Sequence, residues 1–126
     1  MTGVQTCALP ICSKLLAEIG FKIKIHLRLI DYAFRYGGDE FVILLPQTGK
    51  DSGLVVARRL QDVFRQSSLL KDENLNLNIR ASMGMASYPD DAKSAHEIIR
   101  QADEMMYMVK NSTRDNIAVA QQGVLR

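Results

Sequence analysis

A hairpin-like stretch in the first half of the chain constrains the fold more than any other feature. Tyr32, Phe34 and Tyr36 alternate with other residues, which is the two-residue period of a half-buried strand. An unbroken apolar run follows at residues 41–45 and stops at Pro46. Such a run is typical of a strand that is buried on both faces. The sequence therefore predicts a β-hairpin whose second strand lies in the core.

The turn of this hairpin carries two adjacent carboxylates. Gly37 and Gly38 allow a tight reversal, because glycine adopts positive φ at little cost. Asp39 and Glu40 then lie side by side at the tip, where they could hold Mg²⁺. This ion is usually bound by carboxylate oxygens together with oxygens of substrate phosphates. The glycines would let a nucleotide approach the backbone. On spacing alone, a plain polar turn is the simpler interpretation, because turns are rich in Gly and Asp.

Length and composition limit the class of protein. The chain has 126 residues, 47% hydrophobic and 24% charged, which predicts one globular domain. Its net charge of +2 gives no support for a nucleic-acid partner. No apolar run is long enough to span a membrane, and no signal peptide is evident. The two cysteines, Cys7 and Cys12, are expected to be incidental thiols of a cytoplasmic protein.

Helical patterns surround the hairpin. Residues 13–27 have apolar residues at helical spacing, including Leu16, Ile19 and Ile23, and Ser13 is the expected N-cap. A second helix is expected to start at the capping-box pattern of Thr48 and end near residue 66, and a third at the pattern of Ser94.

Two further strands complete the predicted order of elements. They are expected at residues 75–88 and 116–120, on either side of the third helix. The order helix, hairpin, helix, strand, helix, strand predicts an α+β fold with a largely antiparallel sheet.

The residues around the hairpin turn resemble the signature of the GGDEF family of diguanylate cyclases, bacterial signalling enzymes that join two GTP molecules into cyclic di-GMP. The segment Arg-Tyr-Gly-Gly-Asp-Glu-Phe at 35–41 carries the resemblance. Residues 82–89 are similar to the family pattern S-x-G-x-A-x-Y-P, and residues 102–110 are similar to A-D-x-x-x-Y-x-x-K.

The resemblance implies a set of roles at the turn. Asp39 and Glu40 would be catalytic, and Asp39 would be a ligand of Mg²⁺. Gly37 and Gly38 would admit the GTP substrate. Two domains would face each other as a homodimer, so that each bound nucleotide attacks the other.

The resemblance also implies that Lys110 and Arg114 bind the phosphates of GTP. Without it, both residues would be read as cations placed favourably at a helix C-terminus. Thr113 departs from the family, which usually has Gly there. A β-branched residue resists the left-handed conformation expected at that position.

Arg28 and Asp31 form an Arg-x-x-Asp pattern five residues before the glycines. In the family this pattern is an allosteric site that binds the product, cyclic di-GMP. A guanidinium can contact a phosphate or a guanine edge through two bonds, and a carboxylate can accept from guanine N–H groups. The alternative is a surface ion pair at a helix end.

The family fold implied here is a ferredoxin-like palm, similar to that of nucleotidyl cyclases. We expect residues 13–120 to be a partial GGDEF domain that lacks the family's first strand and helix, with 121–126 as a tail. Residues 1–12 resemble translated adapter sequence and are expected to be non-native. Because the missing part carries a metal ligand and the guanine contacts in the family, we expect the chain to be an impaired cyclase. A non-catalytic receptor for cyclic di-GMP and an inert fragment are the alternatives.

Overall fold

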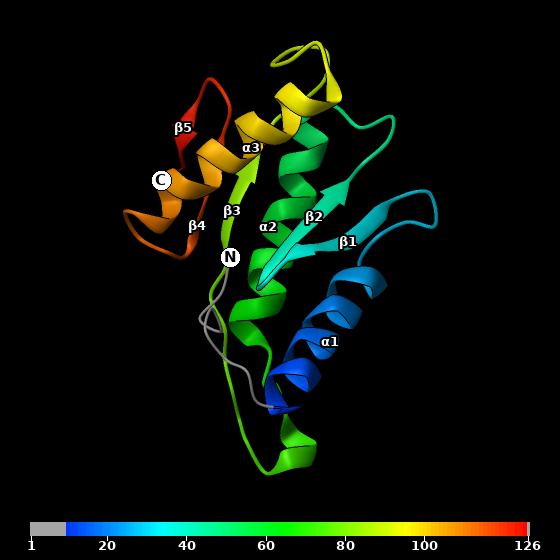
Figure 1. Ribbon diagram of the computed structural model, residues 1–126, viewed down its shortest axis with the longest axis vertical. Helices are drawn as coiled ribbons and strands as arrows, with labels where there is room; N and C mark the ends of the chain where they lie inside the picture. Colours follow the sequence, from blue (N-terminus) through cyan, green and yellow to red (C-terminus); the bar gives the residue numbers. More distant parts are fainter. Residues whose placement is uncertain (1–9, 126) are drawn as a thin grey trace.

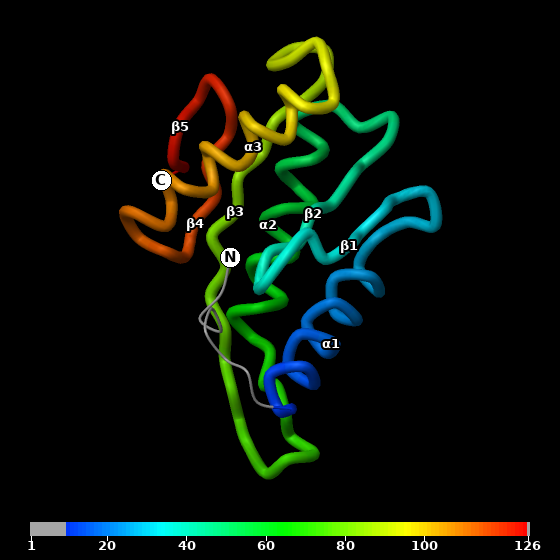
Figure 2. The backbone as a smooth tube through the Cα atoms, in the orientation of Figure 1, coloured from blue at the N-terminus to red at the C-terminus, as the bar shows by residue number. Residues whose placement is uncertain are grey.

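The computed structural model describes residues 10–125 and shows an α+β domain (Figures 1 and 2). In the described residues β1 pairs with β2 in one sheet, and β4 lies between β3 and β5 in another. Two of the three pairings are antiparallel, whereas β3 and β4 are parallel and are joined through α3. The elements are α1 (Pro10–Ile25), β1 (Tyr32–Gly37), β2 (Glu40–Leu44), α2 (Lys50–Gln66), the 3₁₀ turn η1 (Lys71–Glu73), β3 (Ser82–Met85), α3 (Ala95–Lys110), β4 (Asn116–Val119) and β5 (Gly123–Val124).

Helix α1 presents one buried stripe to the core. The stripe contains Cys12, Leu15, Ile19 and Ile23, which recur every three or four residues. Leu15 therefore takes the position in the core that the sequence pattern assigned to Leu16. The stripe packs against buried residues of α2 and of the segment that follows it, namely Leu60, Phe64, Leu69, Leu70, Ile79 and Ala81.

The predicted start of this helix is wrong. Helix α1 begins at Pro10, so Ser13 lies inside the helix and is not its N-cap. Proline is well tolerated in a first helical turn, because the N–H that it lacks would have no intrahelical partner there. Cys12 is disulfide-bonded, so the expectation of a free thiol is wrong for this residue. Cys7 and the rest of residues 1–9 lie outside the described residues.

The β1–β2 hairpin has the predicted antiparallel pairing. Its register runs from Tyr32 opposite Leu44 to Gly37 opposite Glu40 at the turn, with a bulge just before Gly37. However, β2 is not the doubly buried strand that its apolar run predicted. Its residues are half-buried, and Leu44 is 44% exposed. The physical reason is that β2 pairs with β1 along one edge, and no described strand pairs along the other.

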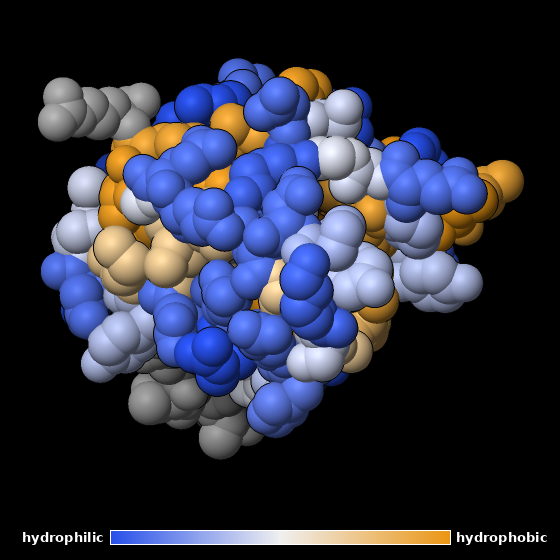
Figure 3. Space-filling view, turned by 90° about the horizontal axis from the view of Figure 1, so that it is seen from above, coloured by the Kyte–Doolittle hydropathy of each residue, from blue (hydrophilic) through white to orange (hydrophobic). Residues whose placement is uncertain are grey.

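Strand β1 is not the half-buried strand that its two-residue period predicted, because all of its residues are exposed. The three aromatic residues of β1 are exposed by 62% at Tyr32, 43% at Phe34 and 60% at Tyr36. Seen from above, apolar residues appear as orange patches toward the margins of a largely hydrophilic face (Figure 3). Large apolar side chains are therefore exposed along β1.

The segment between α2 and β3 is mostly irregular, so the prediction of one strand over residues 75–88 is wrong. Only residues 82–85 form a strand. The reason is local pairing: Leu69 and Leu77 form an isolated antiparallel bridge, with N···O distances of 2.7 and 3.0 Å. This bridge uses the backbone groups of Leu77 and turns the chain back along α2.

Helices α2 and α3 pack against opposite faces of β3. A Cβ atom built on Gly84 would lie 1.8 Å from the carbonyl oxygen of Ala102 in α3. The next residue, Met85, points the other way, because its Cε atom lies 2.9 Å from a Cβ atom built on Gly53 of α2. Strand β3 therefore has a helix on each side.

The helix caps differ in how well the sequence predicted them. Ser94 is the N-cap of α3 as predicted, and its Oγ accepts from the N–H of Glu97 at 3.2 Å. The prediction for α2 is wrong, because its N-cap is Gly49, with no side-chain hydrogen bond. Thr48 uses its hydroxyl elsewhere, as described below. No helix within residues 10–125 is both long enough and apolar enough to cross a membrane.

Candidate active site

The hairpin turn offers an open approach to the backbone. Gly38 has φ +48°, a conformation that favours glycine. Cβ atoms built on Gly37 or Gly38 would meet no atom within 4 Å, so the space before the turn is open. Arg35 closes the turn, because its Nε donates to the carbonyl oxygen of Gly38 at 2.7 Å. This geometry leaves room for a ligand group close to the peptide plane.

The two adjacent carboxylates have different surroundings. Asp39 is buried, with 7% of its surface exposed. Glu40 begins β2 and keeps 34% of its side chain exposed. Its Oε1 lies 3.7 Å from Nζ of Lys110, the last residue of α3. The structure therefore brings the hairpin turn and the end of α3 together.

The donor set at the turn suits a metal ion that is shared with a ligand. No group of three or more His, Cys, Asp or Glu side chains that could hold a metal ion occurs among the described residues. Asp39 and Glu40 supply two carboxylates, and Mg²⁺ is commonly bound by one or two carboxylates together with substrate phosphates and water. The residues present thus fit Mg²⁺ bound together with a nucleotide, but do not form a complete protein cage.

Arg114 lies just past the C-terminus of α3 and folds back on it. Its Nε donates to the carbonyl oxygen of Lys110 at 3.1 Å, and its own N–H donates to that of Val109 at 2.9 Å. The residue with positive φ is Arg114 itself, at +59°, and not Thr113 as the family pattern predicted. The β-branched Thr113 thereby avoids the left-handed conformation that it resists. Both Lys110 and Arg114 stand at the negative end of the helix dipole.

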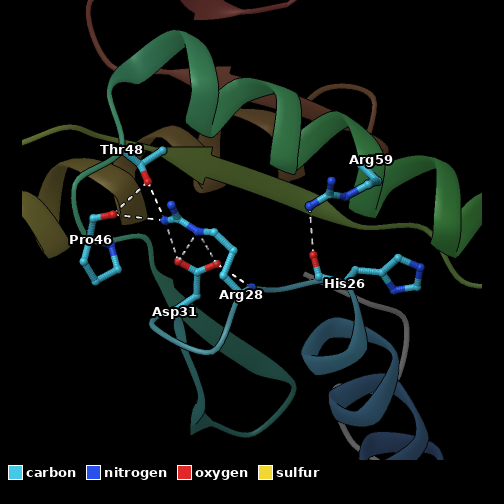
Figure 4. Close-up of polar contacts among 6 residues, drawn as sticks. All are labelled: His26, Arg28, Asp31, Pro46, Thr48 and Arg59. Atoms are coloured by element: carbon cyan, nitrogen blue, oxygen red, sulfur yellow. Dashed lines mark hydrogen bonds and ion pairs between the residues drawn. The ribbon is translucent and has the colours of Figure 1, made fainter.

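Arg28 and Asp31 form a compact ion pair at the other end of the hairpin (Figure 4). Asp31 directly precedes β1, whereas Asp39 lies at the turn. Nη2 of Arg28 lies 2.8 Å from Oδ1 of Asp31, and Nε lies 3.2 Å from both carboxylate oxygens. The Asp31 carboxylate also accepts from the backbone N–H of Arg28 at 2.8 Å. The Asp31 side chain is 2% exposed and that of Arg28 is 52% exposed.

The same guanidinium is held by the segment that follows β2. Nη2 of Arg28 donates to Oγ1 of Thr48 at 2.7 Å and to the carbonyl oxygen of Pro46 at 3.0 Å (Figure 4). Sequence reasoning missed both partners, because Thr48 fitted a capping-box pattern and a carbonyl oxygen carries no sequence signal. Within residues 10–125, the hydrogen bonds of the guanidinium use Nε and Nη2, so Nη1 is available to a ligand.

This arrangement shifts the pKa values of both partners. The side-chain hydrogen bonds from Arg28 are the main cause that lowers the pKa of the Asp31 carboxyl, and they outweigh the opposing effect of burial. The hydrogen bond to Asp31 likewise raises the pKa of Arg28. Both groups are therefore fully charged at neutral pH, and a charged, oriented fork faces partly into solvent.

Comparison with known proteins identifies the family of the chain. The family model described as "Diguanylate cyclase, GGDEF domain" matches residues 10–116. The chain belongs to the GGDEF family of diguanylate cyclases. Members of this family are generally dependent on a metal ion.

Named relatives include diguanylate cyclase A of Treponema denticola, which is 31% identical over 109 residues, and the response regulator PleD of Caulobacter vibrioides, which is 28% identical over 105 residues. These alignments cover 86% and 82% of this chain but 29% and 23% of the relatives. The chain thus spans less than a third of the length of these two proteins.

The fold agrees with solved GGDEF domains. The GGDEF domain of PA1120 from Pseudomonas aeruginosa superposes with a TM-score of 0.80 at 28% identity, over 88% of this chain and 69% of that domain. The diguanylate cyclase SiaD of the same organism, solved with its activator SiaC, gives a TM-score of 0.76 at 29% identity, over 84% of this chain and 40% of SiaD. The α+β palm fold is therefore confirmed.

Proposed function

We propose that this chain is the nucleotide-condensing part of a diguanylate cyclase, which converts two GTP into cyclic di-GMP and two pyrophosphates. In each half-reaction the 3′-hydroxyl oxygen of one GTP forms a bond to the α-phosphorus of the other, and pyrophosphate leaves. The observation that carries the proposal is the 3.7 Å approach of Lys110 to Glu40. The approach brings a cation at the end of α3 next to a carboxylate of the turn, which supports a site where phosphate and metal are bound together.

The residues at the turn would have distinct roles. Asp39 and Glu40 would hold Mg²⁺ together with phosphate oxygens, and Asp39 would help to remove the proton of the 3′-hydroxyl. When bound, Mg²⁺ would polarise the phosphoryl group that is attacked. The open space at Gly37 and Gly38 would admit the nucleotide close to the backbone.

The cations of α3 would bind the triphosphate. Lys110 would exchange its contact with Glu40 for a phosphate oxygen when GTP enters. Arg114 would extend its exposed guanidinium to the same phosphates. A homodimer is needed for turnover, because one chain offers a single such turn and the reaction joins two nucleotides.

We further propose that this chain synthesises cyclic di-GMP from GTP only slowly. The described residues provide only the two neighbouring carboxylates of the turn as metal ligands. A complete site for Mg²⁺ is better served by carboxylates from two separate elements, because adjacent residues of one turn cannot surround an ion.

The second candidate function is a receptor for cyclic di-GMP that does not turn over GTP. It is favoured by the arrangement of Arg28, whose fork is oriented by Asp31 and Thr48 before any ligand arrives. A pre-oriented guanidinium loses less conformational freedom when it binds a phosphate or a guanine edge. Arg28 and Asp31 would form this product site in either candidate function.

Two measurements on the same protein test both candidates. The first is formation of cyclic di-GMP from GTP and Mg²⁺, beside a chain extended at its N-terminus by the corresponding part of a relative's GGDEF domain. The second is a calorimetric titration with cyclic di-GMP. We expect slow turnover of GTP by the 126-residue chain and fast turnover by the extended chain. We expect both chains to bind cyclic di-GMP. Binding without turnover in either chain would favour the receptor, and the absence of both activities would overturn both candidates.

A further inference from the structure

The loop that carries Arg114 joins the end of α3 to the start of β4 and spans residues 111–115. Its first part is fixed to α3, because the N–H groups of Ser112 and Arg114 both donate to the carbonyl oxygen of Val109, at 3.0 and 2.9 Å. Arg114 then has φ +59°, a conformation that a residue other than glycine keeps only where the surrounding contacts hold it. The contacts on the other side of Arg114 therefore matter for the position of its guanidinium.

Two side chains of α2 hold the residue that follows Arg114. Nε of Arg65 donates to Oδ2 of Asp115 at 2.9 Å, and Nη2 of Arg65 donates to the carbonyl oxygen of Asp115 at 3.2 Å. Nε2 of Gln61 donates to the same carbonyl oxygen at 3.3 Å. Asp115 is thus bound at its side chain and at its backbone, by a helix that carries none of the proposed substrate contacts.

The Asp115 carboxylate depends on Arg65 for its counter-charge. The Asp115 side chain is 17% exposed, and its Oδ1 is buried with no hydrogen-bond partner among the described residues. Arg65 forms an ion pair with this carboxylate, and a buried charge that loses its partner is unfavourable. Without Arg65, the carboxylate would be left beside Arg114 and could attract the guanidinium that the phosphates of GTP would need.

We propose that Arg65 is a positioning residue for phosphate binding. It holds Asp115, and with it the loop, so that the guanidinium of Arg114 stays available to the triphosphate of GTP. The inference rests on the proposed function, in which Arg114 binds these phosphates. Gln61 supports the same carbonyl oxygen but carries no charge, so of these two side chains only Arg65 both fixes the backbone and neutralises the carboxylate.

The test is a double-mutant cycle on the full 126-residue protein, read by calorimetric titration with Mg²⁺–GTP. Arg65→Gln should lower the affinity about three- to tenfold, because Arg114 remains present but is less well oriented. Arg114→Ala should lower the affinity at least about tenfold, because it removes a charge-assisted hydrogen bond to phosphate. In the Arg114→Ala protein, Arg65→Gln should cause no loss beyond the effect of net charge, because a residue that acts through Arg114 has no influence once that guanidinium is absent.

The matched control is Arg58→Gln, which removes the same charge from an exposed position of α2 and measures the effect of net charge. The Arg65 side chain is 45% exposed, so Arg65→Gln should stay folded, and thermal unfolding of each variant checks this. The inference is overturned, and the phosphate contact of Arg114 stands, if Arg65→Gln loses no more affinity than Arg58→Gln or loses the same amount with and without Arg114. If Arg114→Ala bound Mg²⁺–GTP with unchanged affinity, the proposed phosphate contact would fail and the inference with it.

Discussion

Nζ of Lys110 lies 3.7 Å from Oε1 of Glu40, although one residue ends α3 and the other begins β2. At this distance the two groups form an ion pair, and their side chains are 21% and 34% exposed. Partial exposure makes the pair weak in the free protein. In the proposed function, Lys110 would therefore leave Glu40 at little cost when a triphosphate binds.

This relationship predicts that Lys110→Gln lowers the affinity for Mg²⁺–GTP by about tenfold to hundredfold, because a charge-assisted hydrogen bond to phosphate contributes about 1.5–3 kcal/mol. The measurement is calorimetric titration with Mg²⁺–GTP. Lys24→Gln is the matched control, because it removes the same charge from an exposed position of α1. If both variants lost the same affinity for Mg²⁺–GTP, the effect would come from the net charge of the protein and not from a contact of Lys110.

Gly84 predicts a sharp difference between two glycine substitutions. Gly84→Ala should destabilise the fold by about 3 kcal/mol or more, because the new Cβ would overlap backbone atoms of α3 at 1.8 and 2.3 Å. Gly20→Ala, inside α1, should be neutral or stabilising by up to about 1 kcal/mol, because its Cβ would lie 3.5 Å from the Phe41 ring. Urea unfolding measures both. A well-folded Gly84→Ala protein would contradict the close packing of α3 on β3.

The Arg28–Asp31 pair predicts a pH dependence of stability. Because the pKa of Asp31 is lowered in the folded protein, its charged form stabilises the fold. This contribution is complete above the pKa of the unfolded chain and is lost as the pH falls through the lower pKa of the folded state. The difference in unfolding free energy between the parent and Asp31→Asn should thus be constant from pH 5 to 8 and shrink below about pH 4.

The control for this experiment is Asp62→Asn, at an exposed position of α2. Its difference from the parent should be small at every pH. A parent–Asp31→Asn difference that grows on acidification would have the wrong sign for a lowered pKa, and the assignment of the ion pair would then fail.

The product site predicts a graded loss of binding. Arg28→Ala should weaken binding of cyclic di-GMP at least tenfold, and Arg28→Lys should lose most of that amount, because an ammonium lacks the planar fork. Arg58→Ala removes a guanidinium from an exposed position of α2 and should have no effect. Thermal unfolding of each variant checks that loss of the contacts to Thr48 and Pro46 has not opened the hairpin. If Arg28→Ala bound cyclic di-GMP with unchanged affinity, the product site would not include Arg28.

Local chemistry made part of the fold predictable. The hairpin turn at Gly38 and the cap at Ser94 follow from short-range rules, and both are confirmed. The burial of β2 was not predictable from its sequence. An apolar run shows that burial would be favourable, but it does not show whether a neighbouring strand is present to cover it. The sequence rule for a buried strand fails at the edge of β2 along which no described strand pairs.

The motifs named residues of the candidate site but did not predict all of their contacts. The motif named Arg28, Asp31 and Lys110, and the structure gives each a charged neighbour. The contact of Thr48 with Arg28 joins segments that are distant in sequence, so no local pattern predicted it. The position of the residue with positive φ after α3 was predicted one residue too early. The family pattern indicated Thr113, but Arg114 has the positive φ.

The last prediction concerns the turn itself. In a chain extended to the full length of a GGDEF domain, Asp39→Asn should lower the rate of cyclic di-GMP synthesis by at least about a hundredfold, because an amide is a poor ligand of Mg²⁺ and cannot accept the hydroxyl proton. Asp39 is 7% exposed, so the isosteric amide should fit. Binding of cyclic di-GMP at Arg28, at the far end of the hairpin, should be unchanged. Asp103→Asn, on the exposed face of α3, is the matched control and should keep its rate. If Asp103→Asn lost turnover and Asp39→Asn kept it, the catalytic carboxylate would lie on α3 and not at the turn.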